Sequence, residues 1–180
     1  HGGLELSNAA YARVLAQTSS HDSSVSLTIG AHSSIGMKGV LLFGNEEQKG
    51  RFLPAFVQGE KILAVAMTAP GAGSDVAGMK TRAEDKGDHW LLNGSKTYIS
   101  NGQLADVVVV AARTVPDQRY GIGLFIVERG MEGFERGRHL QKIGLHAQDT
   151  SELFFNDVKV PKANVLGDPA RGFHYLTHFL

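Results

Sequence analysis

Apolar residues in the first third of the chain recur with the spacing of helix faces. A stripe of alanine, valine and leucine follows Ser7, whose hydroxyl suits an N-cap, and this predicts a first helix. A second helical run is predicted from about Ser24 to Leu42, and its many small residues are typical of a helix packed on several sides. Asn45 begins a third helix, from Glu46 to about Gln58, with Gln48 at the capping-box position.

The pattern changes at Gly59. From Lys61 onward, short runs rich in β-branched and aromatic residues alternate with turn residues, a spacing that favours a barrel or a sandwich. The segment Asp85–Asp88 is typical of a hairpin loop, and Asn93-Gly94 of a tight turn or bulge within a long hairpin. Strands are expected near Leu63–Thr68, Lys80–Glu84, Trp90–Tyr98, Val107–Arg113, Gly123–Val127, His139–Ile143 and Leu153–Val160.

Composition excludes several classes of function. The 180 residues include 18 lysines and arginines against 18 aspartates and glutamates, so no charge excess favours nucleic acid or an anionic membrane as partner. Cysteine is absent, which excludes disulfides, thiolate metal sites and cysteine nucleophiles. The most apolar stretch, Val25 to Phe43, is broken by polar residues, whereas a membrane span needs about 20 nearly uncharged ones. The chain starts at His1 and stops inside a helix-like run, so we expect a piece of a longer protein.

A loop almost without side chains follows the first predicted strand, from Ala66 to Asp75. Such a loop lets a flat or phosphorylated ligand approach the backbone, and it presents consecutive N–H groups to an anion. Thr68 and Ser74 add hydroxyls that donate without carrying charge. A plain glycine-rich turn between two strands explains the same residues, so the loop alone does not decide between them.

Two further segments carry candidate ligand contacts. The long strand that begins at Trp90 ends in Tyr98, Ile99 and Ser100, just before an Asn-Gly turn. An aromatic side chain beside a hydroxyl suits a planar heterocycle, although a core tyrosine followed by a serine that opens a turn is the simpler alternative. The segment Gly144–Pro161 begins with polar residues, which suit either a ligand contact or a solvated loop, and closes with Val-Pro, as an edge strand does.

Other clusters are assigned structural roles. His174 and His178 lie one helical turn apart, a spacing that can bind zinc, but the sequence offers no third ligand and a packed or solvated helix end is preferred. We therefore predict no metal site. The cluster Arg136-Gly137-Arg138-His139 could meet a phosphate, and a solvated face is the default for so short a run. No Gly-x-Gly-x-x-Gly unit supports a Rossmann domain.

Taken together, four segments resemble the acyl-CoA dehydrogenase family over essentially the whole chain. The loop ending in Gly73-Ser74-Asp75 resembles a signature in which a strand runs into Thr-Glu-Pro, two small residues and Gly-Ser-Asp. The segment 90–102 resembles Trp-x-Leu-Asn-Gly-x-Lys-x-Trp-Ile-Thr-Asn-Gly, and 144–161 resembles the stretch that leads into the C-terminal helical domain. Upstream, 43–49 and Leu53-Pro54 match the helix that precedes the β-domain. The run 148–155 is most similar to long-chain members.

The resemblance implies an α+β fold, in which a helical segment is followed by an antiparallel β-barrel-like domain that ends at the start of a C-terminal helical domain. The implied domains are residues 1–60, part of the N-terminal helical domain; 61–165, the middle β-domain; and 166–180, the truncated start of the C-terminal domain. The resemblance also implies an oxidoreductase of fatty-acid β-oxidation that binds FAD between the middle and C-terminal domains, in the bacterial cytoplasm or the mitochondrial matrix.

The family motifs imply roles for specific residues of this chain. Val65, Ala66, Met67 and Thr68 would line the pyrimidine side of the flavin through backbone groups and the Thr68 hydroxyl. Ser74 would lie near both the flavin phosphates and the acyl-CoA substrate. Tyr98, Ile99 and Ser100 would contact the ring near its reactive nitrogen.

The implied reaction is the dehydrogenation of an acyl-CoA to the trans-2-enoyl-CoA. A carboxylate removes a proton beside the thioester carbonyl while a hydride leaves the next carbon for the flavin, and electron-transferring flavoprotein then takes the electrons. The family places that catalytic base beyond Leu180, so no catalytic residue is assigned in this chain and the isolated segment is expected to be inactive. The resemblance further implies a homodimer or homotetramer.

The sequence departs from the family pattern at three of its motif positions. Ala69 stands where the signature has glutamate, and Tyr98 and Ser100 replace tryptophan and threonine. Tyrosine still stacks and serine still donates, so we expect flavin binding with altered redox tuning. Two alternatives stay open: an acyl-CoA oxidase, which shares the fold but passes electrons to oxygen, and a non-catalytic binding module on the same scaffold, which Ala69 favours slightly.

Overall fold

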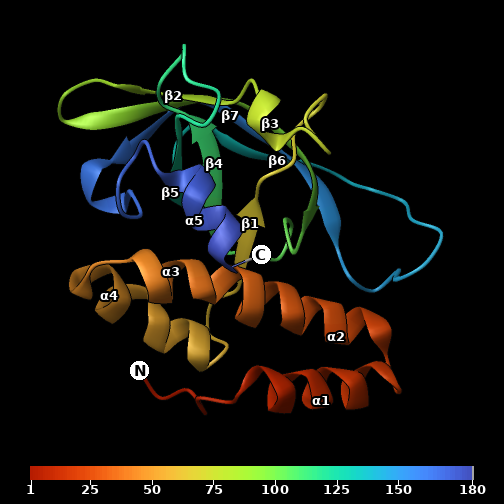
Figure 1. Cartoon of the computed structure of the whole chain (residues 1–180). Helices are drawn as coiled ribbons and strands as arrows, with labels where there is room; N and C mark the ends of the chain where they lie inside the picture. The colour runs from red at the N-terminus through yellow and green to blue at the C-terminus, as the bar shows by residue number, and fades with distance from the viewer. Residues whose placement is uncertain (180) are drawn as a thin grey trace.

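The computed structural model describes residues 1–179 as a layer of short helices beneath a curled sheet (Figure 1). The sequence explains why two of these helices begin where they do. The Ser7 side chain accepts a hydrogen bond from the Ala10 N–H at 3.2 Å, and Asn45 and Gln48 form a complete capping box, so both predicted caps are confirmed. The helices of this layer are α1 (Asn8–Ser19), α2 (Ser23–Gly30), α3 (Met37–Phe43) and α4 (Glu46–Val57).

The predicted run from Ser24 to Leu42 is helical but not continuous. α2 and α3 are joined by a π-helix, η1 (Ala31–Gly36), a wider coil that is often found at functional sites. A Cβ atom added to Gly36 would lie 3.2 Å from the Leu63 side chain, so this residue lets the helix lie directly against the first strand.

The expectation that this run is packed on several sides is wrong for most of its large residues, although Val40 is buried and Met37 packs on the core. Most of its buried positions are small or polar, namely Ser24, Ser26, Ala31, Gly36 and Gly39, and Val40 is the larger residue among them. Small side chains on the inner face let the helix approach the neighbouring elements closely. The larger apolar side chains then lie on the outer face. The exposed apolar residues, between 37% and 54% accessible, are Val25, Leu27, Ile29, Ile35, Leu41 and Leu42.

The sheet has seven strands and is mixed rather than wholly antiparallel, which corrects one part of the prediction. Along one edge of β4, β1 and then β2 pair in parallel, whereas β5 pairs antiparallel along the other edge. The predicted α+β class, with a helical segment before a barrel-like sheet, is confirmed. The strands are β1 (Leu63–Ala66), β2 (Arg82–Asp85), β3 (His89–Ser100), β4 (Val107–Arg113), β5 (Ile122–Glu128), β6 (Phe134–His139) and β7 (Thr150–Pro161).

β4 is the centre of the protein because both of its faces are buried. Val107, Val109 and Ala111 pack toward the helices, and the alternate residues of the strand fill the concave side of the sheet. This explains why its sequence is an uninterrupted apolar run rather than an alternating one. The predicted hairpin loop between β2 and β3 is confirmed, and a bulge at Gly94, where φ is +136°, interrupts the pairing of β3 with β7.

The strand predicted at His139–Ile143 is wrong. β6 ends at His139, and Ile143 is fully exposed in a loop that projects from the sheet (Figure 1). Phe134 anchors the true strand, because its ring stacks on that of Phe155 in β7 at 5.2 Å. The charged sequence of β6 is tolerated because it is an edge strand, with β7 as its neighbour.

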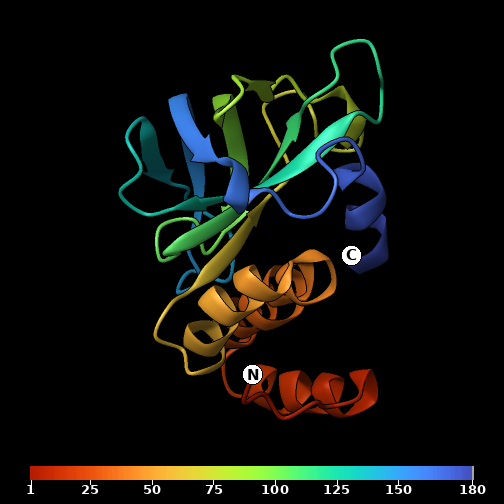
Figure 2. The same cartoon turned by 90° about the vertical axis from the view of Figure 1, so that its left-hand side faces the viewer.

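The described chain ends in a helix that returns to the helical layer. After the short helix η3 (Lys162–Asn164), α5 (Gly172–Phe179) lies beside the sheet and above α3 (Figure 2). The rings of Phe43 and Tyr175 stack at 4.2 Å and join the two helices. Among the described residues, no helix is long and apolar enough to cross a membrane.

Candidate functional site

The loop that follows β1 is held in a defined shape by hydrogen bonds to β3 and within itself. The Thr97 N–H donates to the Thr68 carbonyl at 3.1 Å, and the Thr68 hydroxyl donates to the Thr97 carbonyl. In the turn 69–72, Pro70 and then Gly71 with φ of +82° occupy the central positions, the pattern of a type II turn. The backbone that the sequence offers to a ligand is therefore preorganised.

A first pocket lies between this loop, the end of β3 and the helical layer. Its open volume is about 190 Å³. We call it the Tyr98 pocket, and it is lined by Leu27, Ala31, Ile35, Val65, Met67, Thr68, Tyr98, Ile99 and Ser100.

The structure brings most of the predicted cofactor-binding residues together in this pocket. Those that line it are Val65, Met67, Thr68, Tyr98, Ile99 and Ser100. Ala66 is fully buried in the core on the concave side of the sheet, so its side chain does not reach the pocket. Ser74 lies in an adjoining pocket, and Met67 lines both. The two sets of motif residues thus meet at Met67.

The end of β3 has an irregular backbone that redirects its side chains. The register with β7 shifts between Lys96 and Ile99, and Tyr98 has a φ of +59°, uncommon for a bulky residue. The Tyr98 side chain is 70% exposed, whereas that of Ile99 is buried in the core. The Ser100 hydroxyl is half-buried and has no hydrogen-bond partner among residues 1–179. Tyr98 and Ser100 are thus free to contact a ligand, and Ile99 offers mainly its backbone.

Sequence reasoning missed the helical wall of the pocket. Leu27, Ala31 and Ile35 come from α2 and η1, which the fold places opposite β3. Asn101 fixes this arrangement, because its side-chain amide donates to the Thr28 carbonyl of α2 at 3.0 Å while its own φ is +62°. No local signal in the sequence reveals a contact between residues this far apart.

Lys96 was also missed, although the sequence holds a signal for it. Along β3, Trp90, Leu92 and Lys96 occupy buried positions with a period of two, so Lys96 continues the inward-facing set. Its side chain is completely buried, and its ammonium donates to the Met67 carbonyl at 2.8 Å. Burial away from water lowers the pKa of Lys96 to about 7.

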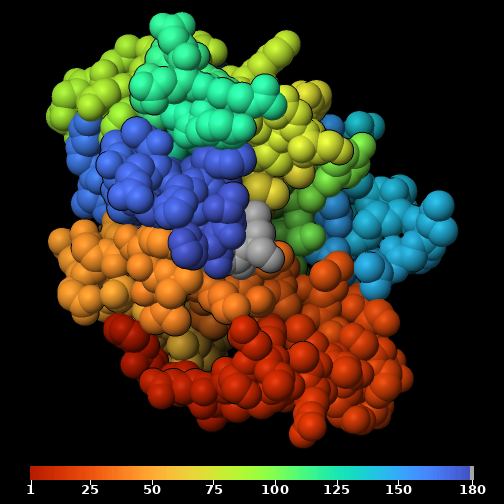
Figure 3. All heavy atoms as spheres, viewed as in Figure 1, coloured from red at the N-terminus to blue at the C-terminus, as the bar shows by residue number. Residues whose placement is uncertain are grey.

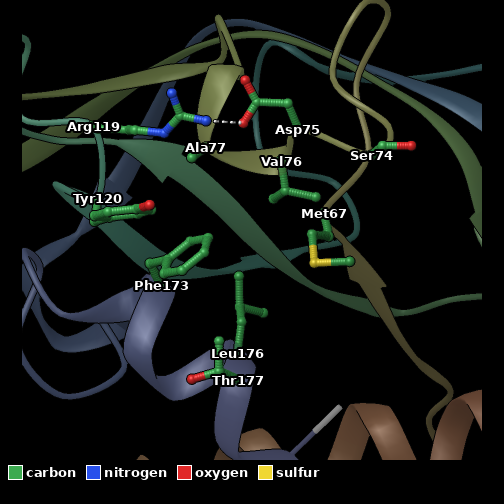
Figure 4. Close-up of a pocket in the computed structure, with 10 residues that line it drawn as sticks. All are labelled: Met67, Ser74, Asp75, Val76, Ala77, Arg119, Tyr120, Phe173, Leu176 and Thr177. Carbon is green, nitrogen blue, oxygen red and sulfur yellow. Dashed lines mark hydrogen bonds and ion pairs between the residues drawn. The ribbon is translucent and has the colours of Figure 1, made fainter.

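The second pocket, here called the Ser74 pocket, has an open volume of about 580 Å³ and is bounded by α5 (Figure 4). Its apolar floor includes Phe173, whose ring lies 4.6 Å from that of Tyr120. At its rim the Arg119 guanidinium donates to the Asp75 carboxylate at 2.9 Å. In the space-filling view, α5 meets the segment 114–121 on the same face (Figure 3). The lining residues are Met67, Ser74, Asp75, Val76, Ala77, Arg119, Tyr120, Phe173, Leu176 and Thr177.

The arginine cluster around Arg136 and the pair His174 and His178, both noted in the sequence, do not line either pocket. Arg136 donates to the carbonyls of Gly102 and Ala105, so it braces the turn after β3. The rings of His174 and His178 lie edge to face at 4.9 Å. Within the described part of the chain, no group of three possible metal ligands is found.

Known proteins resemble this chain over nearly its full length. A family profile described as acyl-CoA dehydrogenase, middle domain, matches residues 64–158, and one described as acyl-CoA dehydrogenase, N-terminal domain, matches residues 1–60. The chain belongs to the acyl-CoA dehydrogenase family. A long-chain specific acyl-CoA dehydrogenase from Sus scrofa is 52% identical over 148 residues, which cover 81% of this chain and 34% of the pig protein.

Solved structures agree with this assignment. An acyl-CoA dehydrogenase from Geobacillus kaustophilus matches with a TM-score of 0.94 and 47% identity, over 98% of this chain and 47% of that one. An acyl-CoA dehydrogenase from Bacillus anthracis, solved in complex with FAD, matches with a TM-score of 0.90 and 37% identity, over 98% of this chain and 30% of its own. The chain thus spans less than half the length of each of these relatives.

Proposed function

We propose that the protein containing this chain is an FAD-dependent acyl-CoA dehydrogenase that converts a long-chain acyl-CoA to the trans-2-enoyl-CoA. The observation that carries the proposal is that Met67 lines both the pocket of Tyr98 and Ser100 and the pocket of Ser74, in a chain of this family. The proposed division is 1–60 for the helical part, 61–165 for the flavin- and substrate-binding β-domain, and 166–180 for the start of a further helical domain.

The residues of the Tyr98 pocket fit the polar edge of a flavin. The backbone N–H groups of Met67 and Thr68 have no hydrogen-bond partner among residues 1–179, and neither has the Ser100 hydroxyl. None of the side chains lining this pocket carries a charge. Neutral, preorganised donors favour a ring that gains negative charge more than they favour the same ring without it.

Each predicted residue then has a proposed task. Val65, Met67 and Thr68 would line the pyrimidine side of the ring, with Ala66 supporting them from the core. Ile99 would offer backbone and Tyr98 and Ser100 side chains near the reactive nitrogen. When bound, FAD would supply the acceptor for the hydride that leaves the substrate. Ser74 would hold the flavin phosphates and the acyl-CoA in the adjoining pocket, and the apolar floor there would exclude water.

The proton in this reaction must be removed by a group outside these pockets. The only carboxylate that lines either pocket among the described residues is that of Asp75, and Arg119 neutralises it. We therefore propose that the base lies beyond Leu180, and that the full protein works as a homodimer or homotetramer and passes electrons to electron-transferring flavoprotein.

Visible absorption of the longest natural form of the protein tests this proposal. Flavin bands that bleach when a long-chain acyl-CoA is added without oxygen would support FAD binding and the half-reaction. Rapid recovery of the bands in air would favour the oxidase alternative. A colourless protein that does not take up added FAD would refute the enzyme proposal and leave a binding module.

A pair of matched variants tests the role of Ser100. In Ser100→Ala the ring loses one neutral hydrogen bond, about 0.5 to 1.5 kcal/mol, which corresponds to FAD binding weaker by up to about tenfold. Ser95→Ala removes a hydroxyl from the same strand outside the pocket and should leave FAD affinity unchanged. Equal affinity in the two variants would contradict the assignment.

A further inference from the structure

Lys96 is a buried cation without a counter-charge. Its side chain is completely inaccessible to water, and none of the ion pairs of the described residues includes it. The groups that its ammonium meets are the Met67 carbonyl at 2.8 Å and the Met79 sulfur at 3.6 Å, both uncharged. A buried charge without a partner costs free energy. The position of Lys96 directly behind the pocket wall therefore suggests a functional role.

The geometry links this lysine to the Tyr98 pocket through one peptide group. The described chain has no cis peptide bond, so the Met67 carbonyl and the Thr68 N–H point in opposite directions. The carbonyl faces Lys96, and the N–H therefore faces away from it. That N–H has no partner among the described residues, and Thr68 lines the pocket. A hydrogen bond at the carbonyl also strengthens the N–H of the same peptide as a donor.

We propose that Lys96 is a positioning residue that holds the Met67–Thr68 peptide with its N–H toward the flavin and makes this wall electropositive, so that reduced flavin is bound more tightly than oxidised flavin. This inference rests on the proposed function. The transfer of a hydride adds two electrons and one proton to the ring and leaves it with one additional negative charge. No charged side chain lines the pocket, and Lys96 would then lie behind its wall, across a single peptide from the ring.

The lowered pKa of Lys96 adds a distinctive consequence. With a pKa of about 7 before reduction, the amine is largely neutral at pH 8. A negative charge across the peptide raises the pKa of the amine, so the side chain takes a proton from solvent when the flavin is reduced. At pH 6 and below the lysine is largely charged in both states and takes up little or no proton. The extra proton uptake therefore begins near pH 7 and is larger above it.

The test is the flavin reduction potential of the FAD-loaded full-length protein as a function of pH, for wild type, Lys96→Met and Lys159→Met. Methionine nearly matches lysine in shape, and Lys159 is an exposed residue of β7 that lies outside both pockets. At pH 6, Lys96→Met should lose at least tenfold in its preference for reduced over oxidised flavin, a potential lower by about 30 mV for a two-electron couple. Above pH 7 the wild-type potential should fall more steeply than that of Lys96→Met, by up to about 30 mV per pH unit.

Two results would overturn the inference and leave the proposed function standing: the same potential and pH slope in Lys96→Met as in Lys159→Met, or, if Lys96→Met does not fold, no steepening in the wild type between pH 7 and pH 9. Failure of the wild type to bind FAD would overturn both proposals. A melting temperature of Lys96→Met at or above that of the wild type, together with the lowered potential, would separate the electrostatic role from a structural one.

Discussion

His32 joins the helical layer to the strand that carries the site. Its Nδ1 atom accepts a hydrogen bond from the Leu63 N–H at 3.0 Å, so Nε2 carries the proton and donates to the Phe56 carbonyl at 3.0 Å. Leu63 begins β1, and Leu63 and Phe56 are almost completely buried. The imidazole is therefore the acceptor for the buried Leu63 N–H and a second partner for the Phe56 carbonyl, which also accepts from the Gly59 N–H at 3.1 Å.

Replacing His32 with phenylalanine keeps a ring of similar size and removes both hydrogen bonds. Each buried backbone group that is left unpaired costs roughly 1 to 3 kcal/mol. The Phe56 carbonyl keeps the Gly59 N–H as a partner, so only the Leu63 N–H is left unpaired, and we expect the free energy of unfolding to fall by about 1 to 3 kcal/mol.

Urea unfolding followed by circular dichroism measures this loss, with an unchanged m-value showing that the folded state stays compact. His139→Phe is the matched control, because His139 is exposed at the end of β6, and a change within about 0.5 kcal/mol is expected there. A loss for His32→Phe no larger than that of the control would refute the reasoning, since the Leu63 N–H would then have found another partner.

Two further outcomes are expected. Gly133→Ala should destabilise the protein by more than 1 kcal/mol, roughly, because φ is +79° there and the new Cβ would lie 2.0 Å from the Asn156 carbonyl oxygen. Gly130→Ala is the control, because φ is +90° there and the new Cβ would lie in open space, so only the backbone part of the cost remains. Equal losses of stability for the two variants in thermal or urea unfolding would argue against the clash. Lys96 has a folded-state pKa of about 7, below its unfolded value of 10.5, so the unfolded chain binds more protons between these values. Stability should then rise with pH above 7 by up to roughly 1.4 kcal/mol per pH unit relative to Lys96→Met, and parallel pH profiles of the two proteins would contradict this.

Features that depend on a few neighbouring residues were predictable from the sequence. The Ser7 cap, the Asn45–Gln48 capping box and the apolar run of β4 follow from local hydrogen bonding and from the alternation of side chains along a strand. The motifs around Thr68 and Tyr98 also indicated which segments would form the site, because their spacing along the chain is characteristic of the family.

The tertiary structure decided which side of each element is buried and which distant segments meet. The edge strand is Phe134–His139 rather than the predicted His139–Ile143, because the ring of Phe134 packs on that of Phe155 in β7, a contact that no local pattern reveals. The tertiary structure also turned the large residues of α2 outward and placed that helix over the Tyr98 pocket. It put Lys96 behind the Met67 carbonyl, out of reach of water. Burial and long-range hydrogen bonds depend on the packing of the whole chain, and neither propensity nor periodicity contains that information.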